Sequence, residues 1–205
     1  MNMHNIILID HLDSFTFNLA DIFKQFNCSV TLVRSDCDFD LMIETIQTTV
    51  NPIIVLSPGP GHPAEAYTSI QIVQQWYQQH PILGICLGHQ ILAQALNGSI
   101  HRDENPLHGK SVHVHHTGQT LFKGLPSPMQ IARYHSLYVN KVPNQFTVSA
   151  HYEGMIMAMH HKFYPVFGLQ FHPESILTPL GKTLIQNFLD IARGFENKER
   201  GYEHV

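Results

Sequence analysis

One cysteine stands where an α/β protein can present a nucleophile. Cys86 has glycines two residues away on both sides, Gly84 and Gly88. An apolar run before it predicts a buried strand, and residues 89–96 after it predict a helix. Such a tight strand-to-helix turn pushes a nucleophile out over the carboxyl edge of a sheet, and the helix N-terminus favours a thiolate. By itself the pattern also fits a small buried residue at a strand end, so a base and an oxyanion site are needed to support a catalytic reading.

A second segment supplies a base and a carboxylate. His172 and Glu174 follow the apolar run 166–171, which predicts another buried strand. A thiol nucleophile needs a base for its proton, and the base needs a carboxylate that fixes its tautomer and orientation. Because both predicted strands belong to one parallel sheet, we expect Cys86, His172 and Glu174 to meet at the same sheet edge.

The loop at residues 57–63, Ser-Pro-Gly-Pro-Gly-His-Pro, suits an oxyanion site. Acyl transfer needs backbone N–H donors aimed at the developing negative charge. Glycine allows the backbone to approach a substrate closely, and the prolines stiffen the loop. We expect the N–H groups of Gly59 and Leu87 to be these donors. Taken alone, the loop could equally be a rigid connector.

The elements that must position these residues form an α/β fold. In the first half, strands are expected at 6–9, 30–33, 53–56 and 81–85, alternating with helices at 15–26, 39–50, 66–79 and 89–96. This alternation predicts an open, mostly parallel sheet flanked by helices. In the second half, antiparallel strands are expected at 111–115, 129–134, 146–151 and 155–160, before the strand 166–171 and a helix at 178–192. We expect one domain over residues 1–195 and a polar tail at 196–205.

Composition excludes several classes of protein. The chain has 205 residues, 43% hydrophobic and 14% charged, with a formal net charge of −4, so no basic footprint indicates nucleic acid. No apolar run reaches the roughly 20 residues that span a bilayer, and the start lacks the pattern of a secretion signal. The 3 cysteines form no Cys-x-x-Cys pair, which indicates reduced thiols. We therefore expect a cytoplasmic protein with no membrane partner.

The 16 histidines invite a metal hypothesis, particularly the stretch from His108 to His116. On a strand His113 and His115 would share a face while His116 points away, and no cysteine or acidic residue completes a ligand set. We expect surface or interface histidines and no metal here. Met155, Met157 and Met159 alternate, which predicts core side chains on one face of a strand.

Several segments, in this order along the chain, carry a resemblance to a known family. They are residues 10–16 (Asp-His-Leu-Asp-Ser-Phe-Thr), 57–61, 84–90 (Gly-Ile-Cys-Leu-Gly-His-Gln), 133–137 (Arg-Tyr-His-Ser-Leu) and 170–175 (Gln-Phe-His-Pro-Glu-Ser). They resemble class I (triad-type) glutamine amidotransferases, specifically the small subunits of anthranilate synthase and aminodeoxychorismate synthase. His108-Gly109-Lys110 resembles a further element of these chorismate-linked subunits.

The resemblance implies roles for individual residues. Cys86 would form a γ-glutamyl thioester from glutamine, His172 would act as general base and acid, and Glu174 would orient it. The amino-acid end of glutamine would be held by three residues: Gln90, Ser136 and Leu137. The ammonia would pass to a separate chorismate-using synthase, the large subunit or component I, in which Mg²⁺ is expected; no cofactor is expected in this subunit.

Alternatives remain at two levels. Anthranilate synthase is the first expectation for the partner, with aminodeoxychorismate synthase, or a chain shared by both, as the alternative. From other classes, a stand-alone γ-glutamyl hydrolase would cleave γ-glutamyl compounds without a partner, and a regulatory module would have lost a triad residue. The Pro-Gly-Pro-Gly loop at 58–61 and the Arg-Tyr-His-Ser-Leu segment argue against the hydrolase, and the complete triad argues against the regulatory module.

Overall fold

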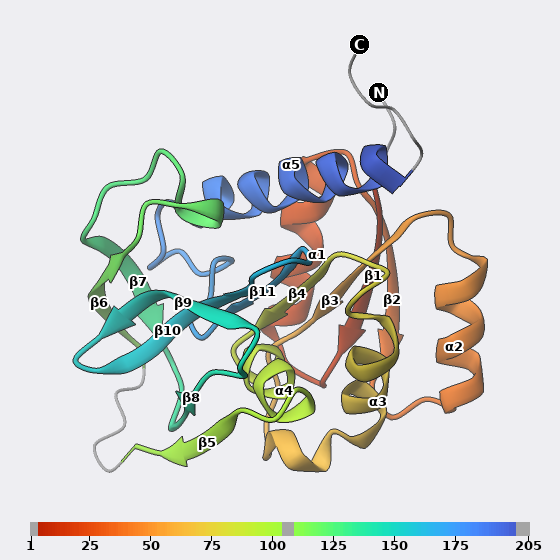
Figure 1. Cartoon of the computed structure of the whole chain (residues 1–205), viewed down its shortest axis with the longest axis horizontal. Coiled ribbons are helices and arrows are strands. Elements are labelled where there is room, and N and C mark those ends of the chain that lie inside the picture. Colours follow the sequence, from red (N-terminus) through yellow and green to blue (C-terminus); the bar gives the residue numbers. More distant parts are fainter. Residues whose placement is uncertain (1–3, 104–108, 200–205) are drawn as a thin grey trace.

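A twisted sheet runs through the protein, which is described by a computed structural model covering residues 4–103 and 109–199, with side chains to residue 195. Figure 1 shows helices on both faces of this sheet. Its strands follow the order β2-β1-β3-β4-β11-β10-β9-β6-β7, and β8 pairs with β10 and with β5 at one side. The predicted α/β class, a mostly parallel sheet with antiparallel additions in the second half, is confirmed.

The first five strands of this order are parallel to one another. They and their helices are β1 (Asn5–Asp10), α1 (Phe15–Gln25), β2 (Ser29–Arg34), α2 (Phe39–Thr48), β3 (Pro52–Leu56), the short 3-10 helix η1 (Pro63–Glu65), α3 (Tyr67–Trp76), β4 (Ile82–Ile85), α4 (Leu87–Ala95), β11 (Val166–Leu169) and α5 (Gly181–Glu199). We call this set the parallel half.

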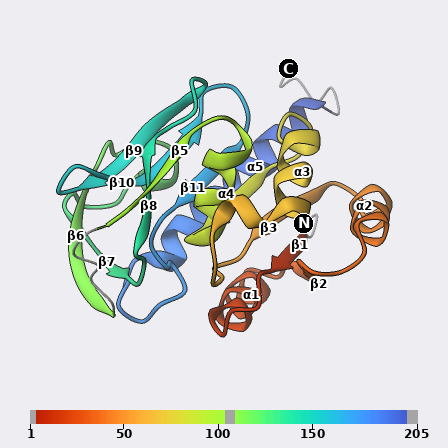
Figure 2. The same ribbon diagram turned by 90° about the horizontal axis from the view of Figure 1, so that it is seen from below.

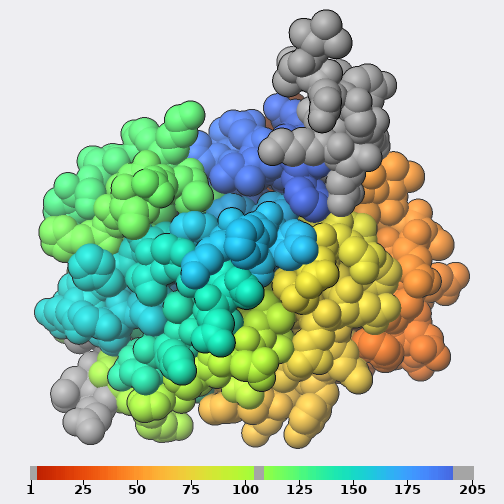
Figure 3. Space-filling view, viewed as in Figure 1, coloured from red at the N-terminus to blue at the C-terminus, as the bar shows by residue number. Residues whose placement is uncertain are grey.

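The remaining strands pair in the antiparallel sense. They are β5 (Ser99–Arg102), β6 (Lys110–His116), β7 (Met129–Arg133), β8 (Leu137–Lys141), β9 (Phe146–Tyr152) and β10 (Met155–His161), with the 3-10 helix η2 (Thr120–Phe122). We call this set the antiparallel half. In Figure 3 its green and teal residues form one continuous body with the orange and yellow residues of the parallel half.

Alternation along the parallel strands creates two cores. Successive side chains point to opposite faces of a sheet, so Ile6 and Leu8 pack with α1 and α5, whereas Ile7 and Ile9 pack with α2, α3 and α4. All four side chains are buried. Figure 2, seen from below, shows α1 and α2 well apart from each other, as expected for helices that pack in different cores. Burial on both faces explains why β1, β3, β4 and β11 are largely continuous apolar runs, whereas the edge strand β2 is mostly exposed and partly polar.

The structure also corrects details of the predicted elements. The strands β5 and β8 were not predicted, because they are short and partly polar and are paired with each other across a long stretch of sequence. Helix α5 spans Gly181–Glu199, so it begins and ends later than the helix predicted at 178–192. Met155 and Met157 lie toward one core, but Met159 lies in the other, because the pairing of β9 and β10 is irregular beside it. The expectation of one shared face was wrong for Met159.

No helix in the described ranges is long and apolar enough to cross a membrane. The residues beyond Glu199 and His108 of the His-Gly-Lys element lie outside the described part of the chain.

Candidate active site

The turn that carries Cys86 is strained and closely packed. Cys86 lies between the end of β4 and the start of α4 with φ +52° and ψ −101°, a backbone conformation that L-residues rarely adopt. A Cβ atom added to Gly88 would lie 2.3 Å from the carbonyl oxygen of Leu56, and one added to Gly84 would lie 2.4 Å from that of Gly88. Glycine is therefore required on both sides of Cys86. The N–H of Cys86 donates to Leu169 O at 2.8 Å and ties the turn to β11.

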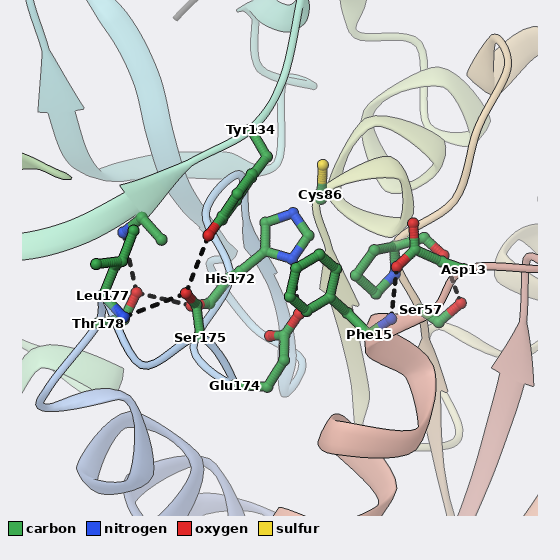
Figure 4. A network of polar contacts seen from close by, with 12 residues as sticks. Asp13, Phe15, Ser57, Cys86, Tyr134, His172, Glu174, Ser175, Leu177 and Thr178 are labelled. Atoms are coloured by element: carbon green, nitrogen blue, oxygen red, sulfur yellow. Dashed lines mark hydrogen bonds and ion pairs between the residues drawn. The ribbon is translucent and has the colours of Figure 1, made fainter. Parts of the chain in front are cut away.

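His172 reaches the same edge of the sheet from β11. Strand β11 runs parallel to β4, with Leu169 paired to Ile85, so both chains leave the sheet at the same end. The Nδ1 atom of His172 lies 2.6 Å from Glu174 Oε1, and the two side chains are only 3% and 0% exposed. Figure 4 shows the other ring nitrogen on the side of Cys86. This Nε2 atom has no hydrogen-bond partner among the described residues.

The surroundings of His172 favour its charged form. Burial lowers the pKa of the ring, but contacts with Cys86 and Glu174 outweigh it and raise the pKa to about 10. A histidine that is held between a carboxylate and a thiol and prefers to be charged can hold the proton of the thiol and deliver it to a leaving group.

Two aromatic rings hold His172 from the sides. The ring centroid of Phe15 lies 5.1 Å from that of His172, and the centroid of Tyr134 lies 5.0 Å from it in an edge-on arrangement. Tyr134 Oη is also 3.4 Å from Ser175 Oγ, and Thr178 Oγ1 donates to His172 O at 2.7 Å (Figure 4). Nothing in the linear sequence indicates that Phe15 and Tyr134 border His172, because the three residues lie far apart in the chain.

One cavity collects the remaining predicted site residues. Its lining comes from the loop after β3, from the turn and first residues of α4, and from the segment between β7 and β8: Gly59, Pro60, Gly61, Cys86, Leu87, Gln90, Tyr134, His135, Ser136 and Leu137. Both predicted oxyanion donors and all three predicted glutamine-binding residues therefore face the same space as the thiol.

The loop that carries Gly59 is fixed by a buried histidine. A Cβ atom on Gly59 would lie 2.4 Å from Cβ of His11 and 2.7 Å from a methyl carbon of Leu87, so only glycine fits. His11 in turn lies 2.9 Å from Ser69 Oγ through Nε2 and 3.3 Å from Ser57 Oγ through Nδ1. Burial lowers its pKa to about 4, so it acts as a neutral hydrogen-bonding link between loops.

The amides of Gln90 and Gln170 form a hydrogen-bonded pair close to the thiol of Cys86. Gln90 Nε2 donates to Leu137 O at 2.9 Å and to Gln170 Oε1 at 3.2 Å. Sequence reasoning quoted Gln170 within a motif but gave it no function. The sequence feature that could have indicated a role for Gln170 is its position immediately beyond the apolar residues of β11, two residues before His172.

The histidine-rich stretch forms no metal site in the described residues. His113 and His115 are exposed on β6, and His116 stacks on Phe122 with ring centroids 4.6 Å apart. The His115 ring stacks on that of His151 across the strand pair, with centroids 6.0 Å apart.

A comparison with protein-family models adds the decisive observation, because the model described as "Glutamine amidotransferase class-I" matches residues 7–192. The chain belongs to the class I glutamine amidotransferase family. This amidotransferase is 44% identical over 188 residues to anthranilate synthase component 2 of Haemophilus influenzae, a match that covers 92% of this chain and 97% of the relative. It is 40% identical over 191 residues to aminodeoxychorismate/anthranilate synthase component 2 of Bacillus subtilis, with 92% and 97% covered.

Solved structures support the fold of this amidotransferase. A GMP synthase homologue from Thermoplasma acidophilum has a TM-score of 0.85 at 24% identity, covering 98% of this chain and 99% of that one. A glutamine amidotransferase from Thermotoga maritima has a TM-score of 0.66 at 18% identity, covering 99% and 87%. At these identities the likeness concerns the fold alone.

Proposed function

We propose that the protein hydrolyses L-glutamine at Cys86 and delivers the ammonia to a separate chorismate-using synthase, with anthranilate synthase as the first candidate. The observation that carries the proposal is the convergence of Cys86, His172 and Glu174 at one sheet edge, beside a cavity lined by Gly59 and Leu87. The names of the relatives in Haemophilus influenzae and Bacillus subtilis support the choice of acceptor.

The reaction follows from the roles that these side chains can take. The Sγ atom of Cys86 attacks the side-chain amide carbon of glutamine, and the N–H groups of Gly59 and Leu87 stabilise the oxyanion. His172 gives its proton to the leaving nitrogen, so that ammonia departs and a γ-glutamyl thioester remains. The same histidine then accepts a proton from water as it attacks the thioester. This step releases glutamate and returns the sulfur, while Glu174 keeps the ring in one orientation.

The amide of Gln90 suits the amino-acid end of the substrate. Both hydrogens of Nε2 are used, by Leu137 O and by Gln170 Oε1. Its Oε1 atom therefore remains as an acceptor next to the cavity, and an acceptor suits the α-ammonium group of glutamine. Ser136 and Leu137 complete this wall and define how far the substrate extends from Cys86.

An apolar rim beside the site suits a protein partner. Leu12, Phe17 and Ile176 are 53%, 64% and 93% exposed, and each lies within two residues of His11, Phe15 or Glu174. Large apolar side chains exposed in the segments that carry site residues suit contact with a partner. A synthase bound over this rim would receive ammonia before it is protonated in water. We place this complex in the cytoplasm, because the free thiols Cys28, Cys37 and Cys86 suit a reducing compartment.

The proposal assigns no cofactor to this chain, because thiol, imidazole and backbone donors supply every step, and it assigns Mg²⁺ to the partner synthase. The acceptor is the part that needs a direct test, because the Bacillus subtilis relative is named for both synthases.

The test mixes the purified chain with each candidate synthase from the same organism, with chorismate, magnesium and glutamine, and with ammonia replacing glutamine as a control. Anthranilate from one mixture alone would support the tryptophan branch, and aminodeoxychorismate from the other alone would support the folate branch. Both products would mean that one chain serves both synthases. If neither forms while both synthases work with ammonia, the proposed acceptor is wrong; hydrolysis of γ-glutamyl compounds without a partner would then favour a stand-alone hydrolase.

A further inference from the structure

We infer that Gln170 is a positioning residue for the nucleophile: it directs an amide N–H at the sulfur of Cys86 and links that sulfur to Gln90. The inference rests on the proposed function, in which Cys86 is the nucleophile. It assigns a role to a side chain outside the triad, the oxyanion donors and the glutamine-binding wall.

The position of Gln170 is unusual for an amide. The residue follows β11 and is 0% exposed, and its backbone N–H donates to Met157 O at 2.9 Å. A buried side-chain amide is costly unless its donors and acceptors are paired, so its partners reveal what holds it there. Those partners are Gln90, at 3.2 Å from Oε1, and Cys86 Sγ, at 3.8 Å from Nε2.

The direction of the Gln170 amide follows from a chain of hydrogen bonds that begins at the backbone. Leu137 O can only accept, so the group of Gln90 that lies 2.9 Å from it must be Nε2. The second hydrogen of that Nε2 points to Gln170, which must therefore present Oε1 to it. The Nε2 atom of Gln170 is then the group that faces Cys86, and it offers the sulfur a donor.

A donor at this place complements His172. Cys86 is fixed at its backbone by the bond from its N–H to Leu169 O, which leaves its side chain to be oriented by what surrounds the sulfur. His172 lies on one side of the thiol as the proton carrier, and Gln170 is buried behind it. An N–H directed at a thiolate stabilises the negative charge and favours one side-chain rotamer. Because Gln170 also holds Gln90, one amide sets both the nucleophile and the residue proposed to meet the substrate.

The experiment compares Gln170→Met with Gln90→Met and with a matched control, Gln74→Met. Methionine has nearly the size of glutamine but has neither the amide oxygen nor the amide N–H donors. Gln74 makes the same kind of contact outside the site, from its Nε2 to Ala95 O at 3.0 Å. Two quantities are measured: kcat and KM for glutamine in the complex with the synthase, and the rate at which iodoacetamide alkylates Cys86, followed on its peptide by mass spectrometry.

Alkylation separates the two effects of Gln170, because iodoacetamide has no amino-acid end and does not need Gln90 as a substrate contact. In Gln170→Met, loss of a hydrogen bond to a charged group should lower the alkylation rate about tenfold and kcat by about 10- to 100-fold. In Gln90→Met KM should rise about tenfold, whereas alkylation should slow less than in Gln170→Met, because Gln170 keeps its N–H donor and loses only the partner that orients it. Gln74→Met should change neither.

A second variant, Gln170→Glu, allows the test even if the Gln170→Met protein does not fold. Gln170→Glu keeps the shape and an oxygen for Gln90 but replaces the N–H that faces the sulfur, so it should also slow alkylation. Thermal unfolding of each variant shows whether it is folded. Alkylation of folded Gln170→Met or Gln170→Glu at the wild-type rate would overturn the inference, as would equal slowing in Gln74→Met. Wild-type protein that gives no turnover with glutamine would contradict the proposed function instead, and the alkylation comparison would still decide whether Gln170 acts on Cys86.

Discussion

The parallel and antiparallel halves of the sheet reach the same cavity in different ways. In the parallel half, Cys86 and His172 stand beyond the ends of adjacent strands, and Gly59 stands in the loop after a third. Their positions follow from strand direction alone. In the antiparallel half, Tyr134 to Ser136 connect β7 to β8, and these residues and Leu137 at the start of β8 reach the cavity because β8 pairs with β10 and β5.

This difference separates two tasks. In the proposed reaction, the parallel half supplies the groups that make and break bonds. The antiparallel half supplies a cavity wall for the substrate and a ring, Tyr134, at the side of His172. Residues that act only in the transition state affect kcat, whereas residues that bind substrate and transition state equally affect KM. Variants in the two halves should therefore differ in which constant they change.

The largest effect is expected from Cys86→Ser, which removes the proposed nucleophile. Glutamine-dependent synthesis should fall on the order of 10⁴-fold or more, because a serine hydroxyl in this setting has no thiolate character. Ammonia-dependent synthesis by the partner should remain at the wild-type level. Both rates are measured in the same complex, and a loss of both would contradict the division of labour between the two chains.

A second effect concerns the turn that only glycine allows. Gly88→Ala should destabilise the protein by about 3 kcal/mol, because the new methyl group meets backbone atoms that cannot move aside. Gly194→Ala is the matched control: no heavy atom lies within 4 Å of the added Cβ on α5, and alanine should stabilise the helix by about 0.5–1 kcal/mol. Urea unfolding measures both, and a Gly88→Ala protein as stable as wild type would refute the packing argument for the turn.

A third prediction concerns how the stability of the fold depends on pH. It involves His89 of α4 and His135 of the segment before β8, which lie near each other where the two halves meet. Burial lowers the pKa of His89 to about 3 and that of His135 to about 4. Both values lie below that of an unfolded histidine, so protons bind the unfolded chain first and stability falls as pH drops below about 6.5. His172 has the opposite sign, since its raised pKa stabilises the fold most fully below that pH.

The measurement is urea unfolding at pH 7 and at pH 5 for wild type and His89→Gln. Wild type should lose about 2 kcal/mol through His89 alone between these pH values, and the variant should lack that part of the loss. An equal loss in both proteins would mean that His89 does not oppose folding at low pH.

The smallest effect is expected in the antiparallel wall. Ser136→Ala should raise KM for glutamine about fivefold, as expected for one neutral hydrogen bond worth about 1 kcal/mol, and leave kcat unchanged. Steady-state kinetics with glutamine and the synthase provide both constants. A fall in kcat with an unchanged KM would erase the proposed contrast between the two halves.

Much of the parallel half could be predicted from residues close together in sequence. The apolar run before Cys86 and the run before His172 each predict a buried strand, and parallel strands end at one edge. This reasoning brings the thiol and imidazole together without any knowledge of the fold beyond its class. The irregular β9–β10 pairing that turns Met159 to the other core has no such local signal, because it depends on how two strands align.

The sequence by itself determined the class of sheet and the order of its motifs, and it predicted Cys86, His172 and Glu174 as nucleophile, base and carboxylate, because these depend on local periodicity and on which residue types can do the chemistry. Only the tertiary structure decided that Phe15 and Tyr134 hold the His172 ring and that Gln170 lies between Gln90 and Cys86. Those contacts join residues far apart in the chain. Their geometry is set by strand pairing and close packing, which no linear pattern encodes.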